Sequence, residues 1–181
     1  MKYIALLRGI NISGKNKVSM SELKLELEKK EYRNVQTYLN SGNVIFETNI
    51  DNKETISKDI YNIIKSKFNI EIPIFIITQF ELEDVLNNNP DWWGTDNKEI
   101  YDNLIFIIPP AKYEEIYDVI GSPKENIEKI KEYNNFIFWS YDLKNYRKSK
   151  WWIKTASTNI SNKITIRTAN TMKKVLEICK R

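Results

Sequence analysis

Hydrophobic residues in the first part of the chain follow two spacings, one typical of strands and one typical of helices. Short segments rich in apolar or strand-forming residues predict four strands, at 3–7, 35–39, 44–47 and 73–77. Between them, Met20, Leu23 and Leu27 are spaced as on one face of a helix. A second stripe, at Ile56, Ile60 and Ile63, predicts another helix.

Polar signals mark the ends of these elements. Ser19 and Glu22 form an S-x-x-E capping box, and Asp51 or Asn52 is expected to cap the second helix. Residues 40–43, Asn-Ser-Gly-Asn, predict the turn of a hairpin. The resulting order is strand, helix, strand, strand, helix, strand. That order is typical of the ferredoxin-like βαββαβ pattern, which has an antiparallel sheet and both helices on one face.

The rest of the chain repeats this order after a break. Residues 78–81 form another candidate capping box, which opens a helix through about residue 86. Residues 87–103 are rich in Asn and contain Pro90 and Gly94, which favours a linker loop. The elements predicted beyond it are strands at 104–108, 127–133, 136–141 and 163–167, helices at 111–119 and 143–155, and a last helix.

These patterns predict an α+β protein, built as a tandem of two ferredoxin-like halves with antiparallel sheets and a C-terminal helix. The expected domains are an N-terminal half with a trailing helix at 1–86, a linker at 87–103, and a C-terminal half at 104–181. Chain length allows two small domains.

Composition narrows the chemistry. The 181 residues include no His and a single Cys, Cys179, so a Cys–His catalytic pair, a zinc site of the usual spacing and a disulfide framework are excluded. We therefore expect no metal and no cofactor, and Cys179 reads as a small buried hydrophobe. The net charge of +4 is too weak to indicate nucleic-acid binding by itself. Without a membrane-spanning apolar run, we expect a cytoplasmic protein that does not associate with membranes.

The loop after the first strand carries the strongest candidate chemistry. In an antiparallel sheet the end of the first strand meets the start of the third, so residues 8–17 are expected beside residues 40–43. Glycine-flanked N–H groups and an Arg side chain are suited to an anion. The candidate ligand-binding residues at this corner are Arg8, Gly9, Asn11, Gly14, Lys15, Lys17, Ser41 and Asn43. A phosphate loop is rejected because Asn16 stands where that motif needs Ser or Thr. Plain turn geometry with solvated lysines remains the alternative.

Two further segments have competing interpretations. Arg167, Asn170 and Thr171 precede the last helix as additional candidate ligand-binding residues, although capping by Thr168 or Asn170 explains most of that segment. The segment 144–154 has five cations among Tyr and Trp residues, which suits nucleic-acid contact or, alternatively, a solvated basic helix with buried tryptophans. Acidic residues near Trp92 and Trp93 have no metal-ligand spacing.

The N-terminal motifs resemble a known bacterial family. The segments Ala5–Asn11, Gly14–Lys17 and Thr37–Phe46, together with Met20 and Glu22-Leu23, resemble the signatures of domain of unknown function 1697. Near the C-terminus the chain keeps Thr165, Arg167, Asn170 and Thr171 of the family's last motif but departs from it at Thr168 and Ala169. The resemblance implies a two-part α+β fold with ferredoxin-like halves and no established activity.

Three functions fit these observations. The first is a protein that binds a phosphate-bearing small molecule or nucleic acid at the corner. The second is a metal-independent enzyme at the same corner, with Tyr38 or Lys15 as the proton-transfer group. The third is an interaction module that forms a homodimer or binds another protein through Trp92-Trp93 or Trp151-Trp152.

Overall fold

The computed structural model describes the backbone of residues 1–181 and the side chains of all of them except Thr158. The chain forms two compact units. Unit 1 contains residues 1–82 and 175–181, and unit 2 contains residues 83–174.

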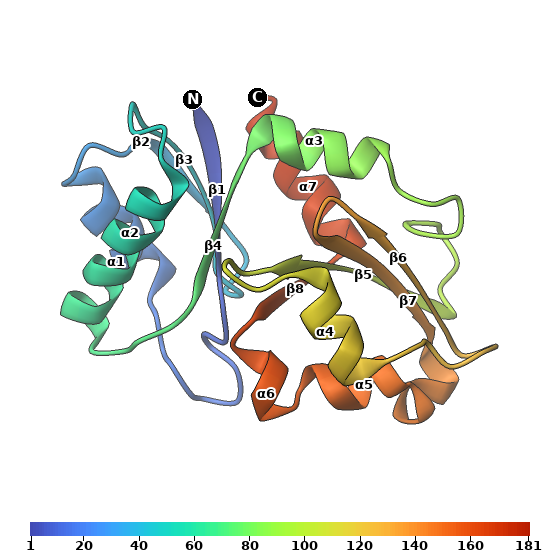
Figure 1. Cartoon of the computed structure of the whole chain (residues 1–181). Coiled ribbons are helices and arrows are strands. Elements are labelled where there is room, and N and C mark those ends of the chain that lie inside the picture. The colour runs from blue at the N-terminus through green and yellow to red at the C-terminus, as the bar shows by residue number, and fades with distance from the viewer. The chain divides into compact units, whose positions relative to one another are not determined.

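Unit 1 is built on one four-stranded antiparallel sheet (Figure 1). Its elements are β1 (Lys2–Leu7), α1 (Met20–Glu28), β2 (Arg33–Tyr38), β3 (Asn43–Glu47), α2 (Lys53–Phe68) and β4 (Ile74–Thr78). The strand order is β2-β3-β1-β4, and each neighbouring pair is antiparallel. The four predicted strands and both predicted helices of this region are present.

The core of unit 1 lies between the sheet and its two helices. Figure 1 shows α1 and α2 together on one face of the sheet. Leu23 and Leu27 of α1 and Ile56 and Ile60 of α2 are fully buried in one cluster with residues of all four strands. Ser19 and Asn52 are the N-caps of α1 and α2, as predicted, although among the described residues no bond from Ser19 N to the Glu22 side chain completes the capping box. Ser19 Oγ accepts from Glu22 N at 3.3 Å, and Asn52, rather than Asp51, caps α2.

Unit 2 contains a second four-stranded antiparallel sheet, of order β6-β7-β5-β8. α3 (Gln79–Asn87) leads into it from unit 1, and Thr78 and Glu81 form the predicted capping box at its start. The remaining elements are β5 (Ile100–Ile107), α4 (Tyr113–Ile120), β6 (Glu128–Tyr133), β7 (Phe136–Asp142), the 3-10 helix η1 (Leu143–Lys148), α5 (Lys150–Thr155), α6 (Thr158–Ser161), β8 (Ile164–Thr168) and the first part of α7 (Ala169–Cys179). Residues 175–179 of α7 belong to unit 1. The α+β class, with two antiparallel sheets, is confirmed.

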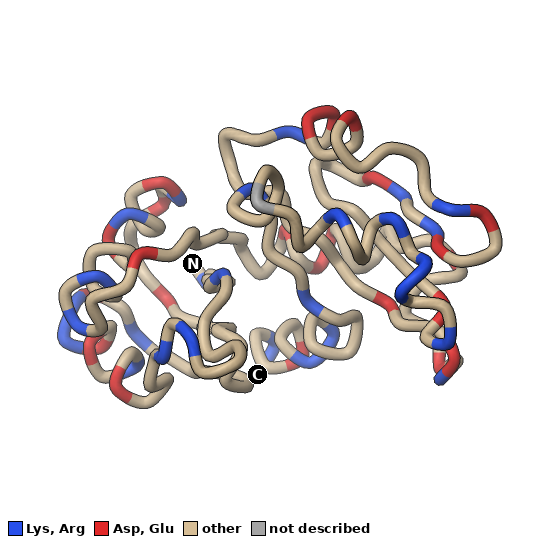
Figure 2. The backbone as a smooth tube through the Cα atoms, turned by 90° about the horizontal axis from the view of Figure 1, so that it is seen from below, with Lys and Arg blue, Asp and Glu red and all other residues tan. Residues whose placement is uncertain are grey.

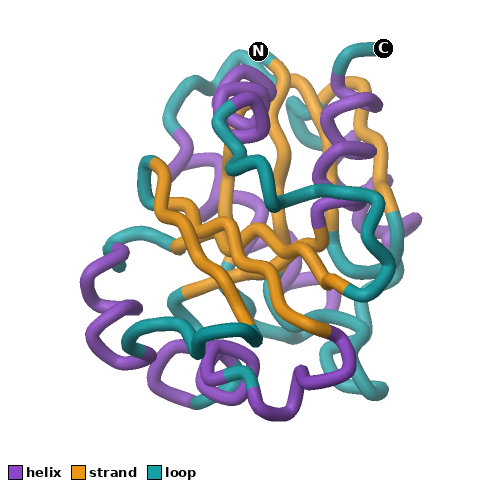
Figure 3. The backbone as a smooth tube through the Cα atoms, turned by 90° about the vertical axis from the view of Figure 1, so that its right-hand side faces the viewer, coloured by secondary structure: helices purple, strands orange, loops and turns teal.

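The structure corrects two predicted elements of unit 2. The helix expected at 143–155 is broken at Ser149, which has an extended backbone and separates η1 from α5. β5 begins at Ile100 rather than Leu104, because Ile100 pairs with Asp142 of β7. The loop before β5 therefore ends earlier than predicted, and Figure 3 shows that loop in teal between α3 and the sheet.

No helix in the described part of the chain combines the length and the apolar character needed to cross a membrane.

Candidate functional site

The end of β1 and the first hairpin form the corner of unit 1. Leu6 pairs with Asn43 of β3, and Leu7 N donates to Gly42 O at 2.8 Å. Gly42 allows this close approach, because a Cβ atom there would lie 2.6 Å from Leu7 Cβ and its φ of +82° suits glycine. The antiparallel pairing thus brings the loop after β1 beside residues 40–43, as the strand order predicts.

Asn11 joins the three parts of this corner. Its Nδ2 atom donates to Asn40 O and to Val18 O, each at 2.9 Å. Its Oδ1 atom accepts from Val18 N at 2.9 Å. One side chain therefore fixes the loop to the hairpin and to the residue before the Ser19 cap, which makes Asn11 a positioning residue.

The loop itself is a compact turn held by its own backbone. Asn11 N donates to Asn16 O at 3.1 Å, and Ile12 and Lys15 form an isolated antiparallel bridge. Asn16 Nδ2 donates to Gly9 O at 2.9 Å. Gly9 and Gly14 have φ values of +67° and +76°, so turn geometry accounts for both glycines.

The other candidate residues of the corner differ in exposure. Asn43 is fully buried, and its Nδ2 atom donates to Tyr38 O and Ser41 Oγ, so it holds the hairpin. Arg8 is half-buried, its N–H donates to Pro73 O, and burial lowers the pKa of its guanidinium. Lys15 and Lys17 are exposed, and neither forms an ion pair in the described part of the chain.

A pocket of about 580 Å³ opens at this corner. It is lined by Asn11, Gly14, Lys17, Val18, Ser19, Met20, Ser21 and Asn40. The first turn of α1 is part of its wall, and the N–H groups of a first turn have no acceptor within their own helix. The lining therefore combines the Lys17 ammonium group with the positive end of α1, and both favour an anion.

The C-terminal candidates belong to unit 2. Arg167 is 8% exposed, and its Nη1 atom donates to Thr165 Oγ1 at 2.9 Å and to Ile166 O at 2.8 Å. Thr168 Oγ1 accepts from Thr171 N at 3.2 Å at the start of α7. Capping therefore explains Thr171, whereas Asn170 is exposed. These two bonds tie the Arg167 guanidinium to its own strand.

Several cations of the basic segment 144–154 contact other groups of the protein. Lys144 pairs with Glu99, Lys150 Nζ donates to Ser122 O, and Lys154 Nζ donates to Val119 O. Figure 2 shows basic and acidic residues interspersed along both units. Trp151 is fully buried and Trp152 is 42% exposed. These contacts favour the interpretation of a packed, solvated segment.

The acidic residues around Trp92 and Trp93 do not gather into a metal site. Asp102 accepts from Gly94 N at 3.0 Å and from Ser140 Oγ, which ties the loop to the sheet. Among the described residues, no three Cys, Asp or Glu side chains are placed to hold a metal ion.

Comparison with known proteins identifies relatives of this chain. Residues 1–138 match the family described as "Protein of unknown function (DUF1697)". Among solved structures, the chain is similar to the conserved bacterial protein SP0830 from Streptococcus pneumoniae, with a TM-score of 0.84 and 28% sequence identity. That likeness covers 98% of this chain and 97% of the other. A comparison with curated proteins found no match. The matched segment spans most of the chain and includes all three N-terminal segments that resemble the family, so the protein belongs to the DUF1697 family of proteins of unknown function.

Proposed function

We propose that this protein binds a phosphate-bearing ligand in the corner pocket of unit 1. The observation that carries the proposal is the convergence of Lys17 and the first turn of α1 on one pocket, next to a loop fixed by Asn11. Lys17 supplies the charge, and the N–H groups of Met20 and Ser21 supply donors. A loop held by its own hydrogen bonds loses little conformational entropy when a ligand binds.

The roles of the remaining candidates follow from their positions. Gly9, Gly14, Asn11, Ser41 and Asn43 shape the corner. Lys15 and Arg8 do not line the pocket, so they contribute to its positive potential from a distance. Arg167, Asn170 and Thr171 lie in the other unit and are not needed for the proposal.

The strand orders support a second, structural proposal. β2-β3-β1-β4 and β6-β7-β5-β8 have the same arrangement when the strands of each unit are numbered in turn. We propose that each unit is a ferredoxin-like domain and that the two domains form a tandem. This frame hosts many unrelated functions, so it adds nothing to the choice of ligand.

Base-free phosphate compounds test the ligand proposal. Isothermal titration with inorganic pyrophosphate and ribose 5-phosphate, at low and moderate salt, is expected to show binding that weakens as salt rises. Lys17→Gln is expected to reduce affinity roughly tenfold, because one charge-assisted contact is lost. Lys30→Gln, an exposed lysine just beyond the other end of α1, is the matched control and should bind as the wild type does. Equal losses in both variants, or no binding by the wild type, would contradict the proposal.

A further inference from the structure

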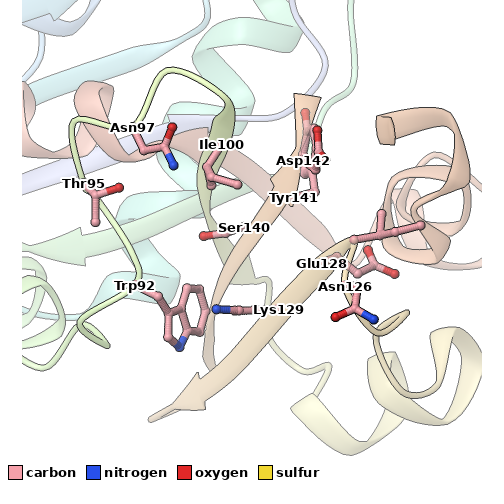
Figure 4. Close-up of a pocket in the computed structure, with 11 residues that line it drawn as sticks. Trp92, Thr95, Asn97, Ile100, Asn126, Glu128, Lys129, Ser140, Tyr141 and Asp142 are labelled. Carbon is pink, nitrogen blue, oxygen red and sulfur yellow. The ribbon is translucent and has the colours of Figure 1, made fainter. Parts of the chain in front are cut away.

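Unit 2 contains a pocket that the corner of unit 1 does not explain. It has a volume of about 460 Å³, within the range typical of small-molecule sites. It lies between the loop before β5 and the ends of three strands, and Figure 4 shows the loop side chains of Trp92, Thr95 and Asn97 on one side and strand side chains on the other. Its lining also includes Ile100, Asn126, Ile127, Lys129, Ser140 and Asp142.

The loop wall of this pocket is fixed to the sheet. Trp93, next to Trp92, is buried, donates from Nε1 to Asn103 O at 2.7 Å and packs edge to face on Phe138 at 5.0 Å. On the other side of Trp93, Gly94 N donates to the Asp102 carboxylate. Two anchors thus hold the backbone that carries Trp92 and Thr95, and the wall exists before any ligand arrives.

The strand register decides which side chains face the pocket. Lys129 pairs with Ser140, which pairs with Asp102, so their side chains share one face of the sheet. Tyr141 points to the opposite face, where its ring packs on Trp139 at 4.8 Å. Because the Tyr141 ring packs on that opposite face, Trp92 is the aromatic platform of this pocket.

The polar groups around Trp92 differ in how many hydrogen bonds and ion pairs they already form within the protein. The Asp142 carboxylate accepts from Lys144 N at 2.7 Å and from Asn145 Nδ2 at 3.1 Å, so it caps η1. Among the described residues, Lys129 forms no ion pair and the Asn126 side chain has no hydrogen-bond partner. Asn97 Oδ1 accepts from Glu99 N at 3.0 Å, which leaves its NH₂ group as a donor.

From this lining we infer that the pocket of unit 2 binds a nucleotide monomer through its base and its phosphate. The heterocyclic base stacks on the Trp92 indole, and amide side chains such as Asn97 and Asn126 pair with the edge of the base. Lys129 contacts the phosphate as a point charge. The volume accommodates one nucleotide. This inference is independent of the proposed function, because it uses other residues in the other unit and requires a base.

Calorimetric titration with the four ribonucleoside monophosphates, using ribose 5-phosphate as the base-free control, tests this inference. We expect one site per chain that prefers a nucleotide to ribose 5-phosphate. Trp92→Ala should weaken it at least tenfold, as expected for a lost base–aromatic stack. Lys129→Gln should weaken it severalfold, while Lys131→Gln, the exposed lysine two positions along β6, should leave it unchanged.

Further variants separate this pocket from the corner. Nucleotide binding weakened severalfold in Lys129→Gln and unchanged in Lys17→Gln assigns the base-dependent site to unit 2. The reverse pattern, unchanged affinity in both Trp92→Ala and Lys129→Gln, or no base-dependent binding at millimolar concentration would overturn the inference. Near-ultraviolet circular dichroism checks that each variant keeps the wild-type fold. Should Trp92→Ala lose that fold, Lys129→Gln against Lys131→Gln decides the question.

Discussion

The two units use the same strand order and differ at the corner where the first strand meets the hairpin. In unit 1 the loop of residues 8–19 binds the hairpin through Asn11, and the first turn of α1 faces a pocket. In unit 2 the corresponding loop is only residues 108–112. There the hairpin residue Asn135 occupies the first turn of α4, since its Oδ1 atom accepts from Tyr113 N at 2.8 Å.

This difference shows how one arrangement of strands yields differently placed pockets. In unit 2 the hairpin side chain of Asn135 accepts from the first turn of α4. Among the described residues of unit 1, no hairpin side chain accepts from Met20 N or Ser21 N in this way. The pocket of unit 2 lies instead where β5 begins, at Ile100, which is the opposite end of the strand that corresponds to β1. The pockets of the two units follow the connections between strands, while the strand orders stay alike.

Among the variants that compare the two units, Glu128→Ala is expected to lower the free energy of unfolding the most. Glu128 is 5% exposed, and its carboxylate accepts from Trp139 Nε1, Ser149 Oγ and Lys150 N. Glu128→Ala leaves these buried donors without an acceptor and should lower the free energy of unfolding of unit 2 by about 3–5 kcal/mol. Arg33 occupies the same first position of β2 and is exposed, so Arg33→Ala should cost less than about 1 kcal/mol.

The stability of unit 2 can be measured separately through the five tryptophans of the chain. All of them, at positions 92, 93, 139, 151 and 152, lie in unit 2, so tryptophan fluorescence during urea unfolding reports on that unit. A Glu128→Ala midpoint equal to that of the wild type would show that the buried carboxylate does not hold the break between η1 and α5.

Gly42→Ala tests the close approach of hairpin and strand in unit 1. The added Cβ would meet Leu7 Cβ and Ile10 Cδ1, at 2.6 and 2.9 Å, and the positive φ adds strain. We expect a loss of about 2–4 kcal/mol, from overpacking and left-handed backbone together. Gly14→Ala, with a similar φ and open space around it, should lose only about 1–2 kcal/mol. Chemical unfolding followed by far-ultraviolet circular dichroism measures both, and similar losses would argue against the steric contact.

Replacing Asn11 or Asn135 by glycine compares how strongly each asparagine stabilises the corner of its unit. Glycine accepts the positive φ of both positions, so the loss reports mainly the hydrogen bonds. Asn11→Gly removes three bonds and should cost about 2 kcal/mol, whereas Asn135→Gly removes the cap of α4 and should cost about 1 kcal/mol. The same unfolding measurement applies. A larger loss for Asn135→Gly would contradict the expectation that the Asn11 hydrogen bonds stabilise their corner more than the Asn135 hydrogen bond stabilises its own.

A last expected effect concerns pH and the thiol of Cys179 in unit 1. Burial raises the pKa of Cys179 from 9.0 to about 11, while Lys2 nearby lowers it to a lesser extent. The raised pKa means that its stabilising contribution is complete below pH 9 and is lost as the pH rises towards 11. The difference in unfolding free energy between wild type and Cys179→Ala should therefore shrink between pH 8 and pH 10.5. A constant difference would contradict a buried neutral thiol.

Local sequence signals were sufficient for much of the fold. Ser19 and Asn52 cap helices within three residues of their partners, and the hairpin turns at residues 40–43 and 134–135 are marked by Asn and Gly. The corner also followed from strand order, because antiparallel pairing forces the two loops together.

Other features depend on partners distant in the sequence. At the break, Ser149 caps α5 locally, because its Oγ atom accepts from Trp152 N at 2.9 Å, but Ser149 Oγ also donates to the Glu128 carboxylate, 21 positions earlier. The pocket of unit 2 needs the loop of residues 92–97 to be anchored on β5 by Trp93 and Asp102. Asp102 precedes the apolar run Leu104–Ile107 in the sequence. That position indicated that its carboxylate would be buried and would hold the fold together.

The assignment of residues 175–181 to unit 1 has a consequence for synthesis on the ribosome. Lys2 Nζ donates to Cys179 O at 2.6 Å, so the first strand of unit 1 is bonded to residues translated after the whole of unit 2. Domains generally fold as units, starting with the N-terminal one, as the chain emerges. Here unit 1 acquires its last segment only after unit 2 has been made, and the two units reach completion in the reverse of their order along the chain.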